Sequence, residues 1–460
     1  MLKIYERRKR RSMLNTWERG RLLLMVAIVI MFLAACENGN TGKNANNGDV
    51  KPVNAEAAAK KPVEIEFWYA LGGKLGQNVE ALIKEFNAAQ DGVIVKGVAQ
   101  GNYEETQQKL QAAIASKKVP AAVLTQNNDW ARKGYFAALD DYIAADVDFN
   151  KDDFIPAFLQ QGVVNDKQFF LPMYGTTQVL YYRKDMLEKA GLTEDVFNTW
   201  ETLADAAAKM TVKKGGTTKV FGWMPMWGRE NMMDAALSRG GRILSEDGKT
   251  VMIDSAEWIE TWEQFRKWFH EEQIMGIHSG GQGWEYWYKT IDDVMQGRAA
   301  GYTGSSGDQG DLDFNVVAAH TQPGWANRAP APMARALMAG IPALASDKQK
   351  QAAYEWLTFF SNTKNTAKWS INTGYISVRS SALEDPDYKA FSEQNPQIKV
   401  PLMQAQSASS AFIDQTGGKI DDALKIAADK VQIENVPAAD ALKEAQQKAQ
   451  AELDKVTGVK

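Results

Sequence analysis

The sequence predicts an α/β protein built from two lobes, and three observations support this prediction. The chain has 460 residues, which is too long for one ordinary domain. Hydrophobic residues make up 45% of the chain and charged residues 24%, as in folded globular proteins. Strand-like and helix-like segments alternate from Val63 onward, a pattern that is typical of a parallel α/β sheet.

The first of these segments follow one another closely. Residues 63–69 alternate and then become wholly apolar, as in a strand that enters a buried sheet. The glycines within 72–76 predict a loop, and apolar residues at helical spacing within 79–86 predict an amphipathic helix. Residues 93–98 and 121–125 are two further predicted strands.

A second helix is predicted between those two strands. Asn102 can cap its N-terminus, and Glu105 lies three residues later as the reciprocal partner. Leu110 and Ile114 mark the side of this helix that we expect to be buried.

The alternation continues through the second half of the chain. Residues 180–182 and 314–319 predict strands, whereas 199–210 and 348–360 predict helices. From Asp421 onward we expect solvent-exposed helices.

One helix carries a tryptophan-rich face. Asp254 is its predicted cap, and Trp258, Trp262, Phe265 and Phe269 follow at helical spacing. Aromatic residues in this pattern predict a contribution to the core and no contact with a ligand.

The single cysteine, Cys36, ends the apolar stretch 22–33, and a basic run at 7–11 precedes that stretch. This order is typical of a secretory signal, and the stretch is shorter than the roughly 20 residues of a comfortable membrane span. Its end, Leu-Ala-Ala-Cys, resembles the lipobox of bacterial lipoproteins, which implies that Cys36 is diacylated. The alternative is an uncleaved signal anchor. We expect a signal peptide at 1–35 and a disordered tether at 36–62.

Charge and metal-binding residue types exclude several functions. Eight of the 53 basic residues and two of the 57 acidic residues precede Cys36, so the remaining chain has a net charge of −10. A chain this acidic is a poor candidate for nucleic-acid binding. One cysteine and three scattered histidines provide no Cys/His metal cluster, and an acidic run at 146–152 lacks the glycine that a calcium loop requires. We expect no metal and no cofactor.

Several tryptophans lie in segments interrupted by glycine and proline. These residues are Trp223, Trp227, Trp284, Trp287 and Trp325. A sugar ring presents an apolar C–H face and a rim of hydroxyl groups, so it suits an indole ring with polar side chains around it. The alternative is that these tryptophans only cover junctions between loops and the core.

A Gly/Ser-rich turn at 301–307 includes Ser305 and Ser306. It offers hydroxyl groups and free backbone N–H groups to a bound molecule. It matches neither a phosphate-binding P-loop nor a nucleophile elbow, and a flexible linker is the alternative interpretation.

An ordered set of short segments resembles family 1 of the extracellular solute-binding proteins, and within it the glycerol-3-phosphate-binding branch. Each segment alone is weak, but their order and spacing hold from about Val63 to Arg379. The segments are 67–68, 71–76, 83–87, 101–104, 119–121, 139–143, 171–172, 179–185, 295–300, Gly340 and 373–378.

The resemblance implies a two-lobe periplasmic-binding-protein-like fold, with hinge-linked α/β lobes and a C-terminal helical extension. Lobe 1 would comprise 63–175 and 311–374, and lobe 2 would comprise 176–310 and 375–460. The chain would cross between the lobes near 175–179, 306–313 and 372–377, and a ligand would be enclosed when the lobes close.

The resemblance also implies a set of ligand contacts. The corresponding positions are Tyr103, Asn127, Thr176, Trp223, Trp227, Ser305, Ser306, Gly340 and Tyr375. The chain departs from the branch in two ways. Asn127 replaces an acidic contact, and the segment 406–412 contains no counterpart of the branch's phosphate-binding arginine. An anionic phosphate is normally met by a fixed guanidinium, so the departures favour a neutral mono- or oligosaccharide.

The expected function is therefore carbohydrate capture without catalysis. We expect a monomer, anchored by lipid at the extracellular face of the cell membrane, that delivers its ligand to the transmembrane subunits of an ABC permease. Three alternatives remain open: binding of a glycerol-phosphate-type solute, a lipid-anchored secreted glycoside hydrolase, and an adhesion lipoprotein without a small ligand.

Overall fold

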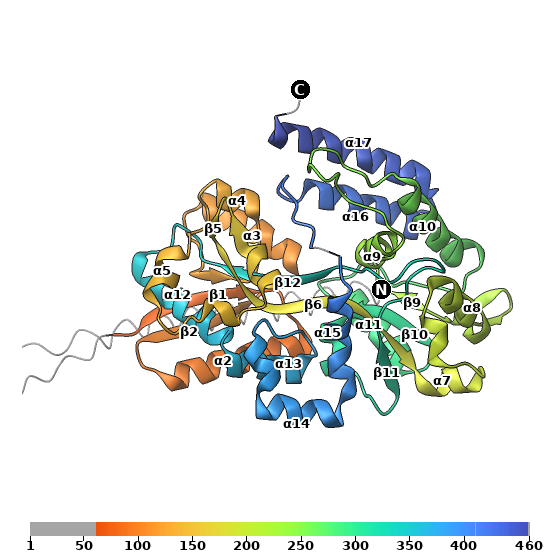
Figure 1. The fold of residues 1–460 in the computed structure, drawn as a ribbon, viewed down its shortest axis with the longest axis horizontal. Helices are drawn as coiled ribbons and strands as arrows, with labels where there is room; N and C mark the ends of the chain where they lie inside the picture. Colours follow the sequence, from red (N-terminus) through yellow and green to blue (C-terminus); the bar gives the residue numbers. More distant parts are fainter. Residues whose placement is uncertain (1–60, 410, 459–460) are drawn as a thin grey trace, which may run out of the picture. The chain divides into compact units, whose positions relative to one another are not determined.

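The computed structural model describes residues 61–409 and 411–458 (Figure 1). The strands are β1 (Val63–Tyr69), β2 (Val93–Ala99), β3 (Ala122–Val123), β4 (Val163–Val164), β5 (Lys167–Gln168), β6 (Phe170–Arg183), β7 (Val212–Lys214), β8 (Thr217–Val220), β9 (Met224–Pro225), β10 (Gly301–Ser305), β11 (Val317–His320) and β12 (Ala334–Gly340). The helices are α2 (Gly73–Ala89), α3 (Tyr103–Ala115), α4 (Asn128–Arg132), α5 (Asp140–Ala145), α6 (Pro156–Leu159), α7 (Lys184–Lys189), α8 (Trp200–Met210), α9 (Glu230–Ser238), α10 (Ala256–Arg266), α11 (Glu285–Met295), α12 (Asp347–Phe360), α13 (Thr363–Thr373), α14 (Pro386–Gln394), α15 (Val400–Gln406), α16 (Lys419–Gln432) and α17 (Ala438–Thr457). The predicted signal peptide, Cys36 and all of the predicted tether except its last two residues lie outside the described residues.

The sheet confirms the α/β class. Its strand order is β2-β1-β3-β12-β6-β10-β9, with β11 also paired to β6. β1 is parallel to β2 and β3, and α2 and α3 connect them in the expected alternation. The predicted loop at 72–76 is wrong, because α2 begins at Gly73 and Gly72 occupies its N-cap position.

The start of α3 has the predicted N-cap, Asn102, whereas the Glu105 side chain, expected as the reciprocal partner, pairs with Lys109. The Asn102 side chain accepts a hydrogen bond of 2.8 Å from the backbone N–H of Glu105. This bond satisfies one of the free N–H groups at the helix N-terminus and fixes the position of Tyr103, the first residue of α3.

Strand β6 is 14 residues long and runs through both halves of the sheet (Figure 1). Residues 170–177 of β6 pair with β12, whereas 178–182 pair with β10 and 180–183 pair with β11. The change of partner falls between Thr177 and Gln178, within the segment 175–179 that was predicted as the first crossing between lobes.

Two groups of buried side chains lie on either side of this crossing. The first core draws on residues 65–174 and 336–378. The core on the other side of the crossing consists of two adjoining clusters of buried side chains, which draw on residues 179–333 and 420–453. These cores differ from the predicted lobe bounds: Val317 and Trp325 pack on the second side, whereas Tyr375 and Val378 belong to the first core. The chain therefore returns to the first core through β12, some 20 residues after the crossing predicted at 306–313.

The C-terminal helices are part of the second core. Leu424 of α16 and Leu442 and Leu453 of α17 are fully buried, and α16 and α17 pack on each other and on α10. The expectation of solvent-exposed helices here is wrong, because one face of each helix is apolar and α10 covers it. Trp258 and Trp262 of α10 are fully buried, which confirms their predicted place in the core; the N-cap is Ser255 in place of Asp254.

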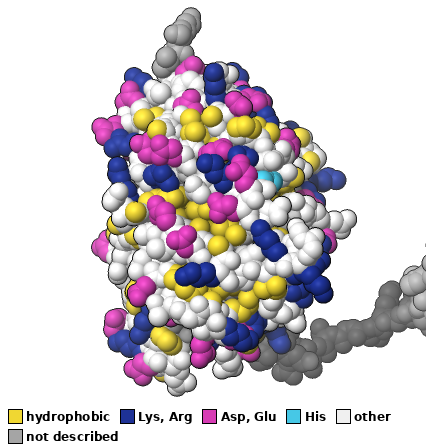
Figure 2. All heavy atoms as spheres, turned by 90° about the vertical axis from the view of Figure 1, so that its right-hand side faces the viewer, with side chains coloured by type: hydrophobic (Ala, Val, Ile, Leu, Met, Phe, Trp, Pro, Cys, Tyr) yellow, Lys and Arg dark blue, Asp and Glu magenta, His cyan; other side chains and the backbone are white. Residues whose placement is uncertain are grey.

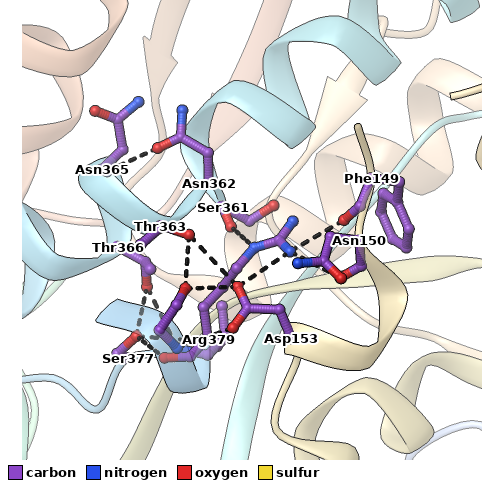
Figure 3. Close-up of polar contacts among 12 residues, drawn as sticks. Phe149, Asn150, Asp153, Ser361, Asn362, Thr363, Asn365, Thr366, Ser377 and Arg379 are labelled. Carbon is purple, nitrogen blue, oxygen red and sulfur yellow. Dashed lines mark hydrogen bonds and ion pairs between the residues drawn. The ribbon is translucent and has the colours of Figure 1, made fainter. Parts of the chain in front are cut away.

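A buried arginine joins three segments of the first lobe (Figure 3). Arg379 is 4% exposed, and its guanidinium donates hydrogen bonds to the backbone carbonyls of Ser361 and Phe149. It lies 3.5 Å from the Asp153 carboxylate and 3.8 Å from the centre of the Phe154 ring. The carboxylate of Asp153 also accepts hydrogen bonds from Ser381, so both charges are compensated away from water.

The face of the molecule drawn in Figure 2 mixes basic, acidic and hydrophobic side chains. Lys and Arg side chains on this face are interspersed with Asp and Glu, and they form no continuous basic tract. A surface of this kind offers no electrostatic stripe for a phosphate backbone.

We predict that Arg379→Met lowers the free energy of unfolding by about 3 kcal/mol, because Asp153 then remains buried without its counter-ion. The control is Lys389→Met, which removes an exposed ion pair with Glu384 and should cost less than about 1 kcal/mol. Urea denaturation measures both changes. A loss for Arg379→Met as small as that of the control would show that the arginine is not essential to the packing of the first lobe.

Candidate functional site

Side chains from the two lobes meet beside the crossing of β6. The indole N–H of Trp284, the N-cap residue of α11, donates a hydrogen bond of 3.1 Å to the carbonyl of Ala70 after β1. The rings of Trp284 and Tyr103 meet edge to face with centroids 5.7 Å apart. Lys425 of α16 forms an ion pair with Glu104 of α3. These contacts hold the lobes close together, and we call the region between them the interlobe site.

Three tyrosines form one wall of the interlobe site. The hydroxyl groups of Tyr103 and Tyr174 are 3.4 Å apart, and the ring of Tyr375 packs on that of Tyr174 at 4.4 Å. Trp369 stacks beneath Tyr174 at 5.2 Å and supports the group from the first core. Burial raises the pKa of Tyr103 to about 12, so its hydroxyl stays neutral and can both donate and accept a hydrogen bond.

A row of hydroxyl groups lies at the crossing itself. The Thr176 hydroxyl of β6 is 3.4 Å from that of Ser305 at the end of β10, and 3.5 Å from that of Ser306. The Tyr181 hydroxyl donates to the backbone carbonyls of both serines and fixes their position. The structure therefore brings together five of the predicted contacts, namely Tyr103, Thr176, Ser305, Ser306 and Tyr375.

Trp227 lies on the second-lobe side of the interlobe site. Its indole N–H donates a hydrogen bond of 2.7 Å to Asp429 of α16, and its ring meets that of Tyr286 edge to face at 4.9 Å. The side chain is only partly buried, so part of the ring is accessible.

Trp223 does not lie in the interlobe site. It is fully buried in the second core, where its N–H donates to the Thr303 hydroxyl at 2.9 Å and its ring packs on Phe197. Its expected contact with a ligand is wrong, because protein already covers the ring. Trp325 is likewise buried in this core, with its N–H bonded to the carbonyl of Ala235.

Two other predicted contacts have structural roles. The side chain of Asn127 is 7% exposed and accepts a hydrogen bond from the backbone N–H of Trp130, so it caps α4. Gly340 pairs with Phe170 at one end of the β12–β6 ladder, whereas Arg335 pairs with Thr176 near the other end. At about 3.3 Å per residue, Gly340 lies roughly 16 Å along the strand from the hydroxyl row, and the structure does not bring it to the interlobe site.

Charged residues that the sequence analysis missed face the same region. Arg229 lies 3.1 Å from Asp421 at the start of α16 and 3.7 Å from Glu230, the first residue of α9. Burial opposes the ionisation of Glu230, but the charges of Arg229 and Arg335 hold its pKa below the ordinary value. The Glu230 side chain nevertheless keeps 36% of its surface accessible. More than a third of the Glu230 side-chain surface is therefore open to solvent.

One of these residues could have been found from the sequence. Arg335 is a single charge within the otherwise apolar run 331–345, and a charged residue inside a buried strand normally has a partner or a function. The sequence gives no comparable signal for Glu230 or Asp421, because each is an ordinary acidic residue in the first turn of a helix.

A buried carboxyl group supports the floor of the site. Asp308 is 5% exposed and accepts hydrogen bonds from the Trp287 indole at 2.8 Å and from the Tyr302 hydroxyl at 3.1 Å. Burial raises the pKa of Asp308 to about 8, and the two hydrogen bonds oppose this only in part. At neutral pH the carboxyl group is therefore mostly protonated.

The residues 61–409 and 411–458 contain no group of three or more His, Cys, Asp and Glu side chains placed to hold a metal ion. Within the same part of the chain, no helix combines the length and the apolar character that crossing a membrane requires.

Comparison with known proteins identifies relatives of one kind. Residues 81–399 match the family described as bacterial extracellular solute-binding protein. The sn-glycerol-3-phosphate-binding periplasmic protein UgpB of Yersinia enterocolitica is 26% identical over 371 residues, which cover 76% of this chain and 81% of that protein.

Solved structures show the same fold. UgpB from Mycobacterium tuberculosis in complex with glycerophosphocholine has a TM-score of 0.73 at 22% identity, covering 85% of this chain and 98% of that chain. An ABC substrate-binding protein from Listeria monocytogenes in complex with cycloalternan has a TM-score of 0.75 at 21% identity, covering 87% of this chain and all of that chain. The two-lobe periplasmic-binding-protein-like fold and its helical C-terminal extension are thus confirmed.

We predict that Asp308 makes the stability of the protein fall as the pH rises. The folded protein keeps a proton on Asp308 up to about pH 8, whereas the unfolded chain releases it near the ordinary value of 3.8. The stabilisation is complete below about pH 4 and is lost as the pH rises through about 8, with a slope of up to about 1.4 kcal/mol per pH unit.

Asp308→Asn, which mimics the protonated carboxyl group, should flatten this dependence between pH 5 and 7. The measurement is urea denaturation of both proteins at several pH values. Equal slopes for the two proteins would show that Asp308 is ionised in the folded state.

Proposed function

Because the chain belongs to the bacterial extracellular solute-binding protein family, we propose that it captures a carbohydrate between its two lobes and delivers it to an ABC permease. The observation that carries the proposal is the interlobe site, in which aromatic rings and hydroxyl groups from both lobes converge on one region. Binding would close the lobes about the β6 crossing, and the closed form would dock on the transmembrane subunits of the permease.

The chemistry of the interlobe site suits a sugar. Tyr103 is partly accessible and offers a hydroxyl group and a ring, whereas Tyr375 is 7% exposed and supports this wall from behind. The partly accessible side chain of Trp227 offers an apolar surface for C–H groups. The hydroxyl groups of Thr176 and Ser305 supply short-range hydrogen bonding at the crossing. The cycloalternan complex of the similar Listeria protein supports a carbohydrate ligand for this fold.

A glycerol-phosphate-type solute is the second candidate ligand. It is favoured by the names of the UgpB relatives, which bind sn-glycerol-3-phosphate or glycerophosphocholine. The segment 406–412 contains no arginine that could meet a phosphate group, and this departure favours the carbohydrate.

We further propose a non-enzymatic role, since the relatives are transport proteins that bind a solute. Hydrolysis of aryl glycosides by the purified protein would instead identify a glycoside hydrolase with paired carboxylates. A failure of every small ligand to raise the melting temperature would favour an adhesion role, because a ligand selective for the folded state must stabilise it.

Calorimetry against mono- and oligosaccharides tests the proposed function directly. We predict that the wild-type protein binds at least one of them, and that Tyr103→Ala and Trp227→Ala each weaken that binding by about 1–3 kcal/mol through loss of a stacked or hydrogen-bonded contact. Tyr142→Ala is the matched control, because Tyr142 packs on Tyr354 in the first lobe and should leave affinity unchanged. Binding of glycerol 3-phosphate but of no sugar would contradict the carbohydrate proposal and support the second candidate.

We also propose that a diacylated Cys36 anchors the protein at the extracellular face of the membrane, as a monomer. We predict that Cys36→Ser moves the protein from the membrane fraction to the soluble fraction, because two acyl chains suffice for stable anchoring. Cell fractionation measures the change, and mass spectrometry of the N-terminal peptide identifies the lipid. An unchanged distribution of the variant would favour the uncleaved signal anchor.

A further inference from the structure

Arg335 lies at the crossing between the lobes. It pairs with Thr176 across the antiparallel ladder of β12 and β6, and directly opposed residues in such a ladder project from the same face of the sheet. Ser305 pairs with Gln178, two residues from Thr176, and shares this face. The Arg335 side chain therefore emerges beside the hydroxyl row of the interlobe site.

The guanidinium of Arg335 has donors to spare. The side chain is partly buried, and within residues 61–409 and 411–458 no hydrogen bond or ion pair involves it. By comparison, the partly buried Arg183 donates to the backbone carbonyls of Val294 and Met295, and Arg229 is paired with Asp421. An arginine has five N–H donors, and leaving them unmatched in a partly buried place is costly unless water or a ligand accepts them.

Glu230 offers the complementary acceptors. Its side chain keeps 36% of its surface accessible to solvent. Asp234, one turn after Glu230 on α9, accepts a hydrogen bond of 3.0 Å from the backbone N–H of Met333, two residues before Arg335, so α9 holds Glu230 beside this end of β12. The charge of Arg335 helps to lower the pKa of Glu230, and the two side chains form no ion pair within 4 Å in the part of the chain that the structure describes. A donor and an acceptor of opposite charge thus face the same space without closing on each other.

Acidic side chains outnumber basic ones around the site. Arg335 also acts on the Tyr103 hydroxyl, where its charge opposes the larger effect of burial on the pKa. The charged groups that surround the site are Arg229, Arg335, Lys425, Glu104, Glu230 and Asp421. Asp429, which accepts the hydrogen bond from Trp227, adds a fourth carboxylate. An anionic ligand would therefore meet more acidic than basic side chains here, whereas an uncharged ligand is not repelled.

We propose that Arg335 and Glu230 determine which sugar is bound, by donating to and accepting from neighbouring hydroxyl groups of one uncharged ligand. This inference rests on the proposed carbohydrate function and names the residues that read the sugar. The planar fork of the guanidinium suits two adjacent oxygen atoms, and the carboxylate accepts from two adjacent hydroxyl groups. The ligand then fills the gap that separates the two charges.

The test is calorimetry of the full folded protein with glucose, maltose, cellobiose, glucuronate and glycerol 3-phosphate. For the best neutral sugar, Arg335→Met and Glu230→Gln should each weaken binding by about 10- to 100-fold, as expected for hydrogen bonds to charged groups. Arg335→Lys keeps the charge without the fork and should recover part of the loss. Raising the salt concentration from 50 to 500 mM should change the wild-type affinity less than about twofold, since the ligand carries no charge.

The matched control is Arg242→Met, which removes an exposed arginine paired with Glu246 in the second lobe and should leave affinity unchanged. Circular dichroism and the melting temperature without ligand verify that each variant is folded; should Arg335→Met fail to fold, Arg335→Lys and Glu230→Gln carry the test.

The outcomes separate this inference from the proposed function. Sugar binding by the wild-type protein with unchanged affinity in both variants would overturn the inference and leave carbohydrate capture in place. A preference for glucuronate or glycerol 3-phosphate that only Arg335→Met abolishes would show that the arginine recognises an anion, and would overturn the uncharged ligand. Absence of binding to every sugar would remove the proposed function and this inference together.

Discussion

The continuity of β6 is the constraint on which the rest of the structure depends. One strand supplies ladder partners to both lobes, so it fixes the point at which β12 ends its pairing and β10 and β11 begin theirs. Residues that alternate along a strand project from the same face at every second position. Tyr174, Thr176 and Gln178 consequently form a row that passes from the first lobe to the second. The interlobe site is built on this row, because side chains from both lobes can reach the hydroxyl groups at the change of partner.

Around this row, buried aromatic residues support the walls of the site, and other residues provide the surface that a ligand can reach. Buried aromatic residues such as Trp369 and Trp223 hold the walls from within each core, and they have no surface left for a ligand. The accessible groups stand at the starts of helices: Tyr103 on α3, Glu230 on α9 and Asp421 on α16. A helix N-terminus favours acidic side chains through its dipole, which helps to explain why two of these groups are carboxylates. Rigid cores with polar helix ends between them are a suitable design for a site that must open and close without deforming its walls.

Periodicity in the sequence was enough to predict the α/β class, the cap of α3 and the buried face of α10, because each depends on residues that are neighbours in the chain. Periodicity gave wrong predictions where segments distant in the chain determine which side chains are buried. Trp223 and Trp227 occur in the same glycine-punctuated stretch, yet one is covered by Phe197 and the other borders the interlobe site, and no local pattern distinguishes them. The exposure expected for α16 and α17 was wrong for the same reason, since α10 lies far away in the chain. Asp421 acquires its importance from Arg229, which tertiary structure brings within 3.1 Å of it, and Glu230 acquires its importance from Arg335, which also lies far from it in the chain.

The contacts that join the lobes are individually weak, and this bears on what closes them. The ion pair between Lys425 and Glu104 is largely exposed, and exposed pairs contribute at most about 1 kcal/mol. The hydrogen bond from Trp284 to Ala70 adds a net contribution of about the same size. Direct contacts of this strength can bias the equilibrium between open and closed lobes but cannot fix it. In the closure that we propose, a ligand that satisfies donors on one lobe and acceptors on the other supplies the missing free energy, and a small direct preference for closure would allow the lobes to release the ligand again.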